Sequence, residues 1–223
     1  MSRQLTSGVL RRKKGKFPEE LKLDLISWYS FNNTLNDSSG NELNGSALNE
    51  IYVDGIVNKG FDLTSNNIVT VNHNALYDFG TGEYTLSSWV KADKNEQADT
   101  FIYSIFKNAT GFRLYFRVSD GAIRTRRGSS SFVSPISPTD CLTGDWVHTA
   151  ISFKSNGFCQ FFINGESDGD VEIGTENVNN TSELIFGGLT NFIGFIDEVA
   201  IWNRALTQEE IKKLYNNGNG ITL

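Results

Sequence analysis

Short segments in which apolar and polar residues alternate, separated by turn signals, run along most of this chain. Alternation with a period of two is typical of β-strands with one buried face, so the pattern favours an all-β fold. Asp120-Gly121 and Asn164-Gly165 each supply the positive φ that a tight two-residue hairpin requires. The strands expected from the pattern are 25–31, 84–90, 99–107, 111–118, 122–127, 145–153, 157–163, 183–187 and 194–202. Such a series predicts an antiparallel β-sandwich of jelly-roll type.

One helix is expected, close to the end of the chain. Residues 207–210 have the form of a capping box, with Thr207 at the N-cap and Glu210 three residues later. Residues 216–218 offer a left-handed stop. Helical spacing places Leu214 and Tyr215 on one face, so this helix is expected to pack them against the sandwich.

Composition excludes several classes of protein. With 223 residues, 16 phenylalanines and only 3 prolines, the chain can build a core without disulfides or metals and is not intrinsically disordered. Cys141 and Cys159 do not make a disulfide framework and are expected to be free thiols. No apolar run reaches the 18 or so residues of a membrane span, and the chain shows no visible secretion signal.

The charge of the chain is unevenly distributed. Residues 1–20 contain six basic side chains and only two acidic ones, Glu19 and Glu20, so their net charge is +4. Since the whole chain has a net charge of −6, the other residues together have −10. We therefore divide the chain into a basic N-terminal arm, 1–20, and a domain, 21–223. An arm of this kind fits protein neighbours in a larger assembly, although a solvated tail explains the same charge. The arm residues of interest are Arg11, Arg12, Lys13, Lys14 and Lys16.

Five ordered blocks between residues 24 and 217 carry a family resemblance. They are Leu25–Phe31 with the following Asp37–Asn41, then Gly60–Asp62 with Ile68–Val71, Gly144–Ala150, Phe162–Gly165, and Gly194–Leu206. Together they resemble the LamG-like jelly roll of the concanavalin A-like lectin/glucanase superfamily. The resemblance implies two curved antiparallel sheets and a role in adhesion or carbohydrate binding.

The sequence does not favour catalysis. A glycoside hydrolase needs two carboxylates facing each other across a sugar. The nearest approach is the acidic segment 166–172, which contains Ser167 and Gly169 and is expected to be a solvated loop. His73 and His148 are the only histidines, and no nucleophile motif or zinc spacing accompanies them. We expect His148 to have a packing and hydrogen-bonding role.

Calcium is the one cofactor that the resemblance suggests. The segment 186–191 matches the acidic stretch of pentraxin-like modules but has no carboxylate. Asp37 and Asp197 remain as candidate ligands of a structural calcium ion. The alternative is that Asp37 caps its own turn at 38–40 and that Asp197 accepts backbone hydrogen bonds.

The segment 111–127 is the clearest candidate for a binding site. As a hairpin turning at Asp120-Gly121, it would pair Arg117 with Arg124 and Tyr115 with Arg126. Opposed like charges cost stability, so an anionic counterpart such as an acidic sugar or a phosphate is expected, unless carboxylates on adjacent strands neutralise the face. The residues that share this face are Arg113, Tyr115, Arg117, Arg124 and Arg126.

These observations predict a non-catalytic, lectin-like binding or adhesion module that recognises a glycan or an anionic surface. An arm on a chain without a visible secretion signal suggests part of a virus or phage particle, with a cytoplasmic location as the alternative. The second function considered is a structural decoration or assembly protein anchored by its arm, and the third is a glycoside hydrolase. Sequence-specific binding of nucleic acid is not expected.

Overall fold

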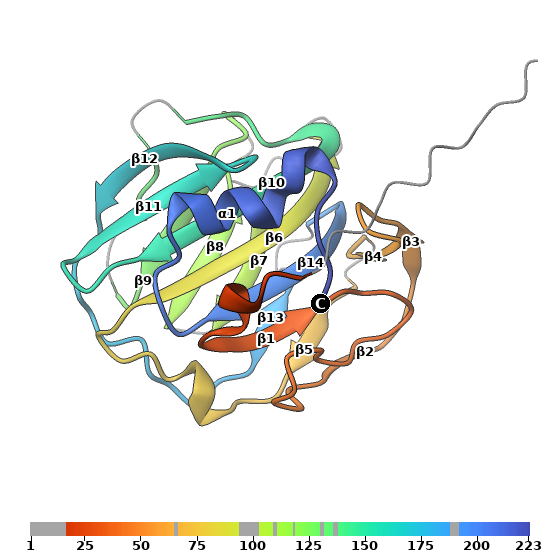
Figure 1. Cartoon of the computed structure of the whole chain (residues 1–223), viewed down its shortest axis with the longest axis horizontal. Coiled ribbons are helices and arrows are strands. Elements are labelled where there is room, and N and C mark those ends of the chain that lie inside the picture. The colour runs from red at the N-terminus through yellow and green to blue at the C-terminus, as the bar shows by residue number, and fades with distance from the viewer. Residues whose placement is uncertain are drawn as a thin grey trace, which may run out of the picture.

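The structure is a computed structural model that describes residues 17–64, 67–93, 103–108, 111–117, 119–129, 132–135, 138–187 and 192–223, with the backbone alone for 103–108. Two antiparallel sheets face each other in this part of the chain, with one helix on the outside (Figure 1). The predicted β-sandwich of jelly-roll type is confirmed. The five basic residues proposed for the arm lie outside the described residues.

The larger sheet has the strand order β12-β11-β10-β6-β14-β4-β3, and β1 pairs with β14 beside this path. Its strands are β1 (Leu25–Tyr29), β3 (Tyr52–Asp54), β4 (Lys59–Asp62), β6 (Tyr84–Asp93), β10 (Thr143–Phe153), β11 (Phe158–Ile163), β12 (Glu166–Glu172) and β14 (Phe195–Trp202). The long strands β6, β10 and β14 form its centre, which makes this sheet the rigid base of the molecule.

The smaller sheet has the order β2-β5-β13-β7-β8-β9. Its strands are β2 (Gly45–Ala47), β5 (Val69–Val71), β7 (Tyr103–Asn108), β8 (Phe112–Phe116), β9 (Ile123–Arg127) and β13 (Leu184–Phe186). One face of each strand points to the larger sheet, because Val69, Val71, Leu184, Phe186 and Leu114 are all buried in the core between the sheets. The opposite face of the smaller sheet is its outer face.

Aromatic side chains fill much of the space between the sheets. The rings of Tyr84 and Phe153 stack 4.2 Å apart, and Phe79 stacks on Tyr84 at 4.6 Å. Cys141 and Cys159 are buried and free, as predicted.

A second apolar cluster lies on the outer face of the larger sheet, under α1 (Gln208–Tyr215), which crosses this face in Figure 1. Trp28 and Trp202 meet edge to face at 6.0 Å, and Ile211 and Leu214 of the helix are buried against the cluster. The predicted capping box of Thr207 is present, and Asn216 ends the helix in the left-handed conformation with φ 48°. The helix therefore closes the outer face of the larger sheet.

The beginning of the described chain also belongs to this cluster. Phe17 packs edge to face on Trp28 with ring centroids 4.9 Å apart, and Leu21 is fully buried. The carbonyl of Leu21, in the 3-10 turn Glu19–Lys22, accepts a 2.7 Å hydrogen bond from Trp202 Nε1. The packed body thus includes residues that precede position 21.

The acidic segment 166–172 is a strand, so the expectation of a loop is wrong. It forms β12 at the edge of the larger sheet, where Val171 pairs with Cys159 and packs against the core. Gly169, with φ 121°, lies opposite Phe161, next to an irregularity in the register. An edge strand has a free side in water, and this is why its composition resembles that of a loop.

The β8–β9 hairpin has a longer turn than the two-residue one predicted. Phe116 pairs with Ile123, and Arg117 N donates to Ala122 O at 3.0 Å, so the turn lies between Arg117 and Ala122 and is longer than two residues. The register therefore differs by two residues from the predicted one. A shift of two keeps every side chain on its predicted face.

Candidate functional site

The candidate site is the outer face of β8 and β9, where Arg113, Tyr115, Arg124 and Arg126 lie; we call it the arginine face. Arg113 pairs directly with Arg126, and Tyr115 with Arg124, instead of the predicted pairs Arg117–Arg124 and Tyr115–Arg126. Because directly paired residues point to the same side of a sheet, the four side chains share one surface.

The row of paired backbone positions continues beyond the hairpin. Position 107 on β7 pairs with Arg113, which in turn pairs with Arg126. Further along the row, Ile185 of β13 pairs with Lys107. Like charges in directly opposed positions repel, which costs a few tenths of a kcal/mol or more for each pair.

One arginine of this face is neutralised by the protein itself. Arg124 forms an ion pair with Asp120 at 2.7 Å, and its second terminal nitrogen donates to Ser134 Oγ at 2.6 Å. Asp120 is thus part of the electrostatics of the site as well as of the turn. The alternative that carboxylates neutralise the face therefore applies to Arg124.

Arg113 and Arg126 are different. Neither has a carboxylate partner among the described residues, and the Nε of Arg113 is buried without a hydrogen bond there. Burial lowers the pKa of Arg113, and the positive charge of Arg126 lowers it further. Both effects disfavour the cation, so an anion between the two guanidinium groups would relieve them.

Phe132 covers part of this face from the segment that follows β9. Its ring meets the ring of Tyr115 edge to face at 4.6 Å, and Arg126 lies over it at 5.2 Å from the centroid. Tyr115 is buried beneath, whereas Phe132 itself is 37% exposed. The arginine face therefore combines two cations, for which the described residues supply no carboxylate partner, with one accessible aromatic ring.

Arg117 and Arg127 occupy other positions. Arg117 is exposed at the start of the loop, where its backbone closes the turn. Arg127, which the sequence analysis did not select, is fully buried on the core side, where its guanidinium donates to Gly82 O at 2.9 Å and Glu176 O at 3.0 Å. Side chains alternate between the two faces of a strand. Because Arg124 and Arg126 project from the outer face of β9, this alternation could have placed Arg127 on the core face.

Asp37 is saturated with donors from the protein. Its Oδ1 accepts hydrogen bonds from the backbone N–H groups of Trp28 and Ser39, both at 2.9 Å. Its Oδ2 accepts from Ser39 Oγ at 2.7 Å and from Leu43 N at 3.2 Å. Four donors match the four lone-pair positions of a carboxylate, which leaves none for a cation. The geometry favours the alternative in which Asp37 caps its own turn.

Asp197 lies apart from Asp37, on β14, and is fully buried. Its Oδ2 accepts from Ile56 N at 2.8 Å and Val57 N at 3.1 Å, and its Oδ1 accepts from Glu198 N at 2.8 Å. Burial raises the pKa of Asp197 to about 8. Among the described residues, no group of three or more histidine, cysteine and acidic side chains is placed to hold a metal ion. A role of Asp37 and Asp197 in binding calcium stays a prediction.

The remaining candidates for chemistry have structural partners. His148 is buried, with Nε2 3.0 Å from Ser87 Oγ, in the packing role expected for it. The acidic residues of β12 bind neighbours: Glu166 pairs with Lys212 at 3.1 Å and Asp170 with Lys154 at 3.5 Å. No helix in the described part of the chain is long and apolar enough to span a membrane.

Comparison with solved structures gives relatives of the same architecture. The binding domain of Paraclostridial Mosquitocidal Protein 1 matches with a TM-score of 0.76 and 24% identity over 89% of this chain and 53% of that one. The botulinum neurotoxin serotype D binding domain matches with a TM-score of 0.69 and 21% identity over 86% of this chain and 51% of that one. This chain thus spans about half the length of either toxin domain.

A third relative is matched over nearly its whole length. Domain 4 of AbnA, a GH43 extracellular arabinanase from Geobacillus stearothermophilus, was solved in complex with arabinotriose. It matches with a TM-score of 0.65 and 25% identity over 85% of this chain and 97% of that domain. A search of curated proteins finds no significant match. Residues 63–212 match a laminin G-type family model, so the chain belongs to the Concanavalin A-like lectin/glucanases superfamily.

Proposed function

We propose that this protein is a non-catalytic binding module that recognises acidic glycans through its arginine face. The single observation on which the proposal depends is the direct pairing of Arg113 with Arg126, with no carboxylate partner for either among the described residues. The repulsion between the two arginines lowers the stability of the folded protein. We expect such a pair to be kept on the surface because it binds an anionic ligand.

The chemistry of the face suits a sugar with a carboxylate or sulfate group. Guanidinium groups bind such anions bidentately through paired N–H donors. The exposed ring of Phe132 offers an apolar surface for the C–H face of the same sugar. The relatives support a binding role, since two of them are binding domains of toxins and the third is a domain solved with an oligosaccharide.

The test replaces Arg113 and Arg126 with threonine and measures binding to soluble heparin oligosaccharides and to oligogalacturonate by calorimetry. Loss of two charge-assisted contacts is expected to weaken binding at least about tenfold. Wild-type affinity should fall with added salt, because the contact is ionic.

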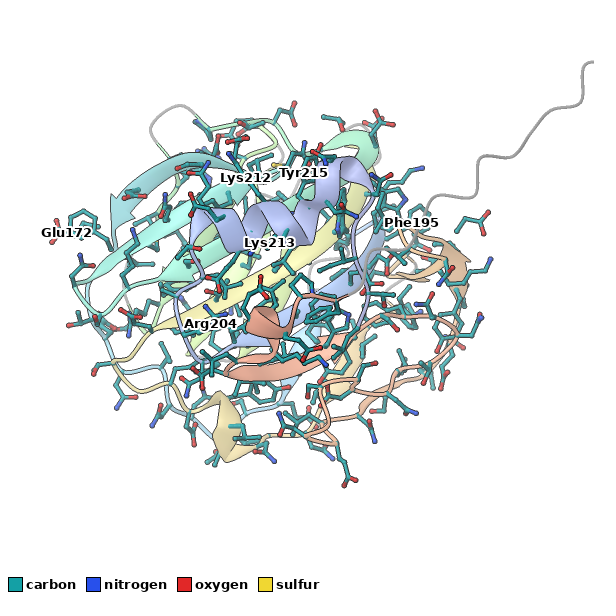
Figure 2. The ribbon with its side chains drawn as sticks, viewed as in Figure 1. Glu172, Phe195, Arg204, Lys212, Lys213 and Tyr215 are labelled. Atoms are coloured by element: carbon teal, nitrogen blue, oxygen red, sulfur yellow. The ribbon has the colours of Figure 1, made fainter. Side chains whose placement is uncertain are left out.

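The matched control removes two charges from the opposite side of the molecule. Lys212 and Lys213 lie on α1 (Figure 2), where they form exposed ion pairs with Glu166 and Glu20. The double change Lys212→Thr and Lys213→Thr alters net charge equally and should leave affinity within about twofold. Equal losses in both variants would mean that net charge alone attracts the ligand.

The second candidate function is a structural or assembly protein anchored by its basic arm in a virus or phage particle. The uneven charge of the chain, six basic side chains in its first 20 residues, favours it. If the arm is the anchor, deletion of residues 1–16 abolishes incorporation into a sedimenting particle and leaves glycan binding unchanged. Loss of glycan binding in the same deletion would assign the arm to the binding site.

A further inference from the structure

We infer that the protein has a second carbohydrate site, for uncharged sugars, in a groove on the outer side of the larger sheet between the β10–β11 turn and the start of α1. The groove has a volume of about 450 Å³ and is lined by Glu83, residues 154–156, Gln160 and residues 205–208. This lies within the range of about 300–1,000 Å³ usual for small-ligand sites. The inference does not depend on the arginine face, which belongs to the other sheet.

The wall of the groove on the helix side is fixed by buried hydroxyl groups. Leu206 N donates to Thr85 Oγ1 at 2.9 Å, and Ser152 Oγ donates to Leu206 O at 3.0 Å. Thr85 Oγ1 also donates to Arg204 O at 2.8 Å, and both Thr85 and Ser152 are fully buried. The connection from β14 to α1, which begins near the labelled Arg204 in Figure 2, is therefore held on β6 and β10 before any ligand arrives.

The opposite wall is fixed through Glu83. Its Oε1 accepts from Ser155 N at 3.2 Å and from Ser155 Oγ at 2.9 Å. These hydrogen bonds lower the pKa of Glu83 and keep it ionised, and a backbone hydrogen bond with Ala205 contributes to the same shift. Glu83 thus holds the β10–β11 turn, while Thr85 and Ser152 hold the β14–α1 connection, so the groove is preformed and binding costs little ordering.

The groove presents donors and acceptors of neutral character. Gln160 Nε2 donates to Ser167 Oγ at 3.2 Å, and Gln208 Nε2 donates to Glu166 at 2.8 Å. Each amide thereby has a fixed orientation, while its carbonyl oxygen accepts no hydrogen bond from the described residues. Asn156 Oδ1 accepts from Phe158 N at 3.2 Å, which directs its amide nitrogen outward. Amide groups of this kind match the hydroxyl groups of a sugar, each of which both donates and accepts.

Phe158 lies next to the groove without lining it. Its carbonyl accepts a 2.8 Å hydrogen bond from the N–H of Lys154, a lining residue, and its side chain projects from the same outer face as that of Gln160, two residues along β11. The side chain of Phe158 is 38% exposed. Its ring offers an apolar surface beside a row of polar groups, the combination that an uncharged sugar with one apolar face requires.

Charge separates this groove from the arginine face. The cation at its edge, Lys154, lies 3.5 Å from Asp170, and the carboxylate of Glu83 is engaged with Ser155. An anionic sugar would meet the carboxylate of Glu83 here, whereas a neutral one would not be repelled. The two sites therefore select different sugars.

The experiment is an NMR titration of the full-length, ¹⁵N-labelled protein with neutral tetrasaccharides of glucose, galactose, mannose and xylose. At least one of them is expected to shift the backbone amides of residues 154–160 and 205–208 in a saturable manner, and not those of 113–126. Phe158→Ala should weaken that binding at least about tenfold. Phe132→Ala, which removes a ring of nearly equal exposure (37%) from the arginine face, should leave it unchanged.

The inference is overturned if none of the four sugars shifts the groove amides, or if Phe158→Ala and Gln160→Ala both bind as the wild type does. The spectra of the variants show directly whether each is folded, so a loss of binding is separated from a loss of structure. Failure of acidic glycans to bind in a parallel titration would refute only the proposed arginine face, because the neutral sugars report on the groove.

Discussion

Burial determines the protonation state of His148, whose side chain lies near α1. Its ring lies 5.2 Å from that of Trp89 and 6.2 Å from that of Tyr215, which α1 supplies. Desolvation lowers its pKa from 6.5 to about 3. The native protein therefore keeps this imidazole neutral over most of the acidic range.

This shift predicts a loss of stability in acid. Below pH 6.5 the unfolded chain binds a proton at His148 that the native state excludes until about pH 3, so the free energy of unfolding falls in that window. Between pH 7 and pH 5 the loss from this residue is about 2 kcal/mol. Urea unfolding of the wild type and of His148→Gln at both pH values measures it as the difference between their pH dependences. Asp197, whose raised pKa acts in both proteins, cancels in this comparison, and parallel pH profiles would contradict the prediction.

The hydrogen bonds of Asp37 lead to a prediction about stability and about calcium. Asp37→Ala removes the acceptor of four hydrogen bonds and leaves the Trp28 and Ser39 N–H groups without it, so it should destabilise the fold by about 2–4 kcal/mol. Addition of EDTA to the wild type should leave the melting temperature unchanged, because the carboxylate has no lone pair left for an ion. A fall in melting temperature with EDTA that calcium reverses would revive the calcium hypothesis.

At the scale of elements, the β11–β12 hairpin joins a local turn to the packing of α1. Ile163 pairs with Glu166 across Asn164 and Gly165, which adopt φ 50° and 81°, so the predicted two-residue turn is confirmed. A Cβ on Gly165 would lie 3.1 Å from Tyr215 Cδ1. Tyr215 in turn stacks on Trp89 at 5.6 Å. The turn glycine therefore allows the helix to approach the sheet.

Gly165→Ala should cost more than a left-handed backbone alone explains. Gly174 has nearly the same φ, 82°, but open space where a Cβ would be, so Gly174→Ala measures the backbone cost alone, about 1–2 kcal/mol. Gly165→Ala adds the displacement of Tyr215 and is expected to exceed its control by about 1 kcal/mol or more. Chemical denaturation of both variants gives the difference. Equal costs would mean that Tyr215 moves aside freely.

An irregularity in the pairing of β1 changes the face to which its side chains point. In β1, strict alternation would place Leu25 and Tyr29 on one face, but the register against β14 shifts between Leu25 and Ser27. Leu25 consequently joins the cluster under α1, while Tyr29 enters the core between the sheets. A bulge of one residue exchanges the two faces of everything beyond it.

At the scale of the whole molecule, the two outer faces are covered differently. The outer face of the larger sheet is sealed by α1 and the segment from Phe17 to Leu21, apart from the groove at its side. Within the described ranges α1 is the one α-helix, and it packs on the larger sheet. On the arginine face, Arg113 and Arg126 are half-buried.

Two truncations test where the folded body begins. Removal of residues 1–16 should leave the free energy of unfolding unchanged, because the cluster under α1 begins at Phe17 in the described part of the chain. Removal of residues 1–22 also takes away Phe17 and Leu21 and exposes Trp28 and Trp202, so it should cost more than about 4 kcal/mol. Urea unfolding of both truncations distinguishes the two. Comparable stability of the pair would place the segment 17–22 outside the cooperative unit.

Local patterns in the sequence determined the strand series, the Asn164-Gly165 turn, the capping box of Thr207 and the residues that share the arginine face. Each depends on residues within a few positions of one another, where period and φ preference suffice. The segment 166–172 was misread because an edge strand has solvated polar residues, and β2, β3, β4 and β5 are too short, at three or four residues, to show a period.

Tertiary structure decided the rest, since it depends on segments distant in sequence. The β8–β9 register is set by later residues, as Ala122 bridges to Asp140 and Thr125 to Val133. Phe132 reaches the arginine face only because that segment folds back along β9. The groove is assembled from Glu83, the β10–β11 turn and the start of α1, three places with no common signal along the chain. Which cations are neutralised and where a hollow remains follow from packing, because both are properties of neighbours in space.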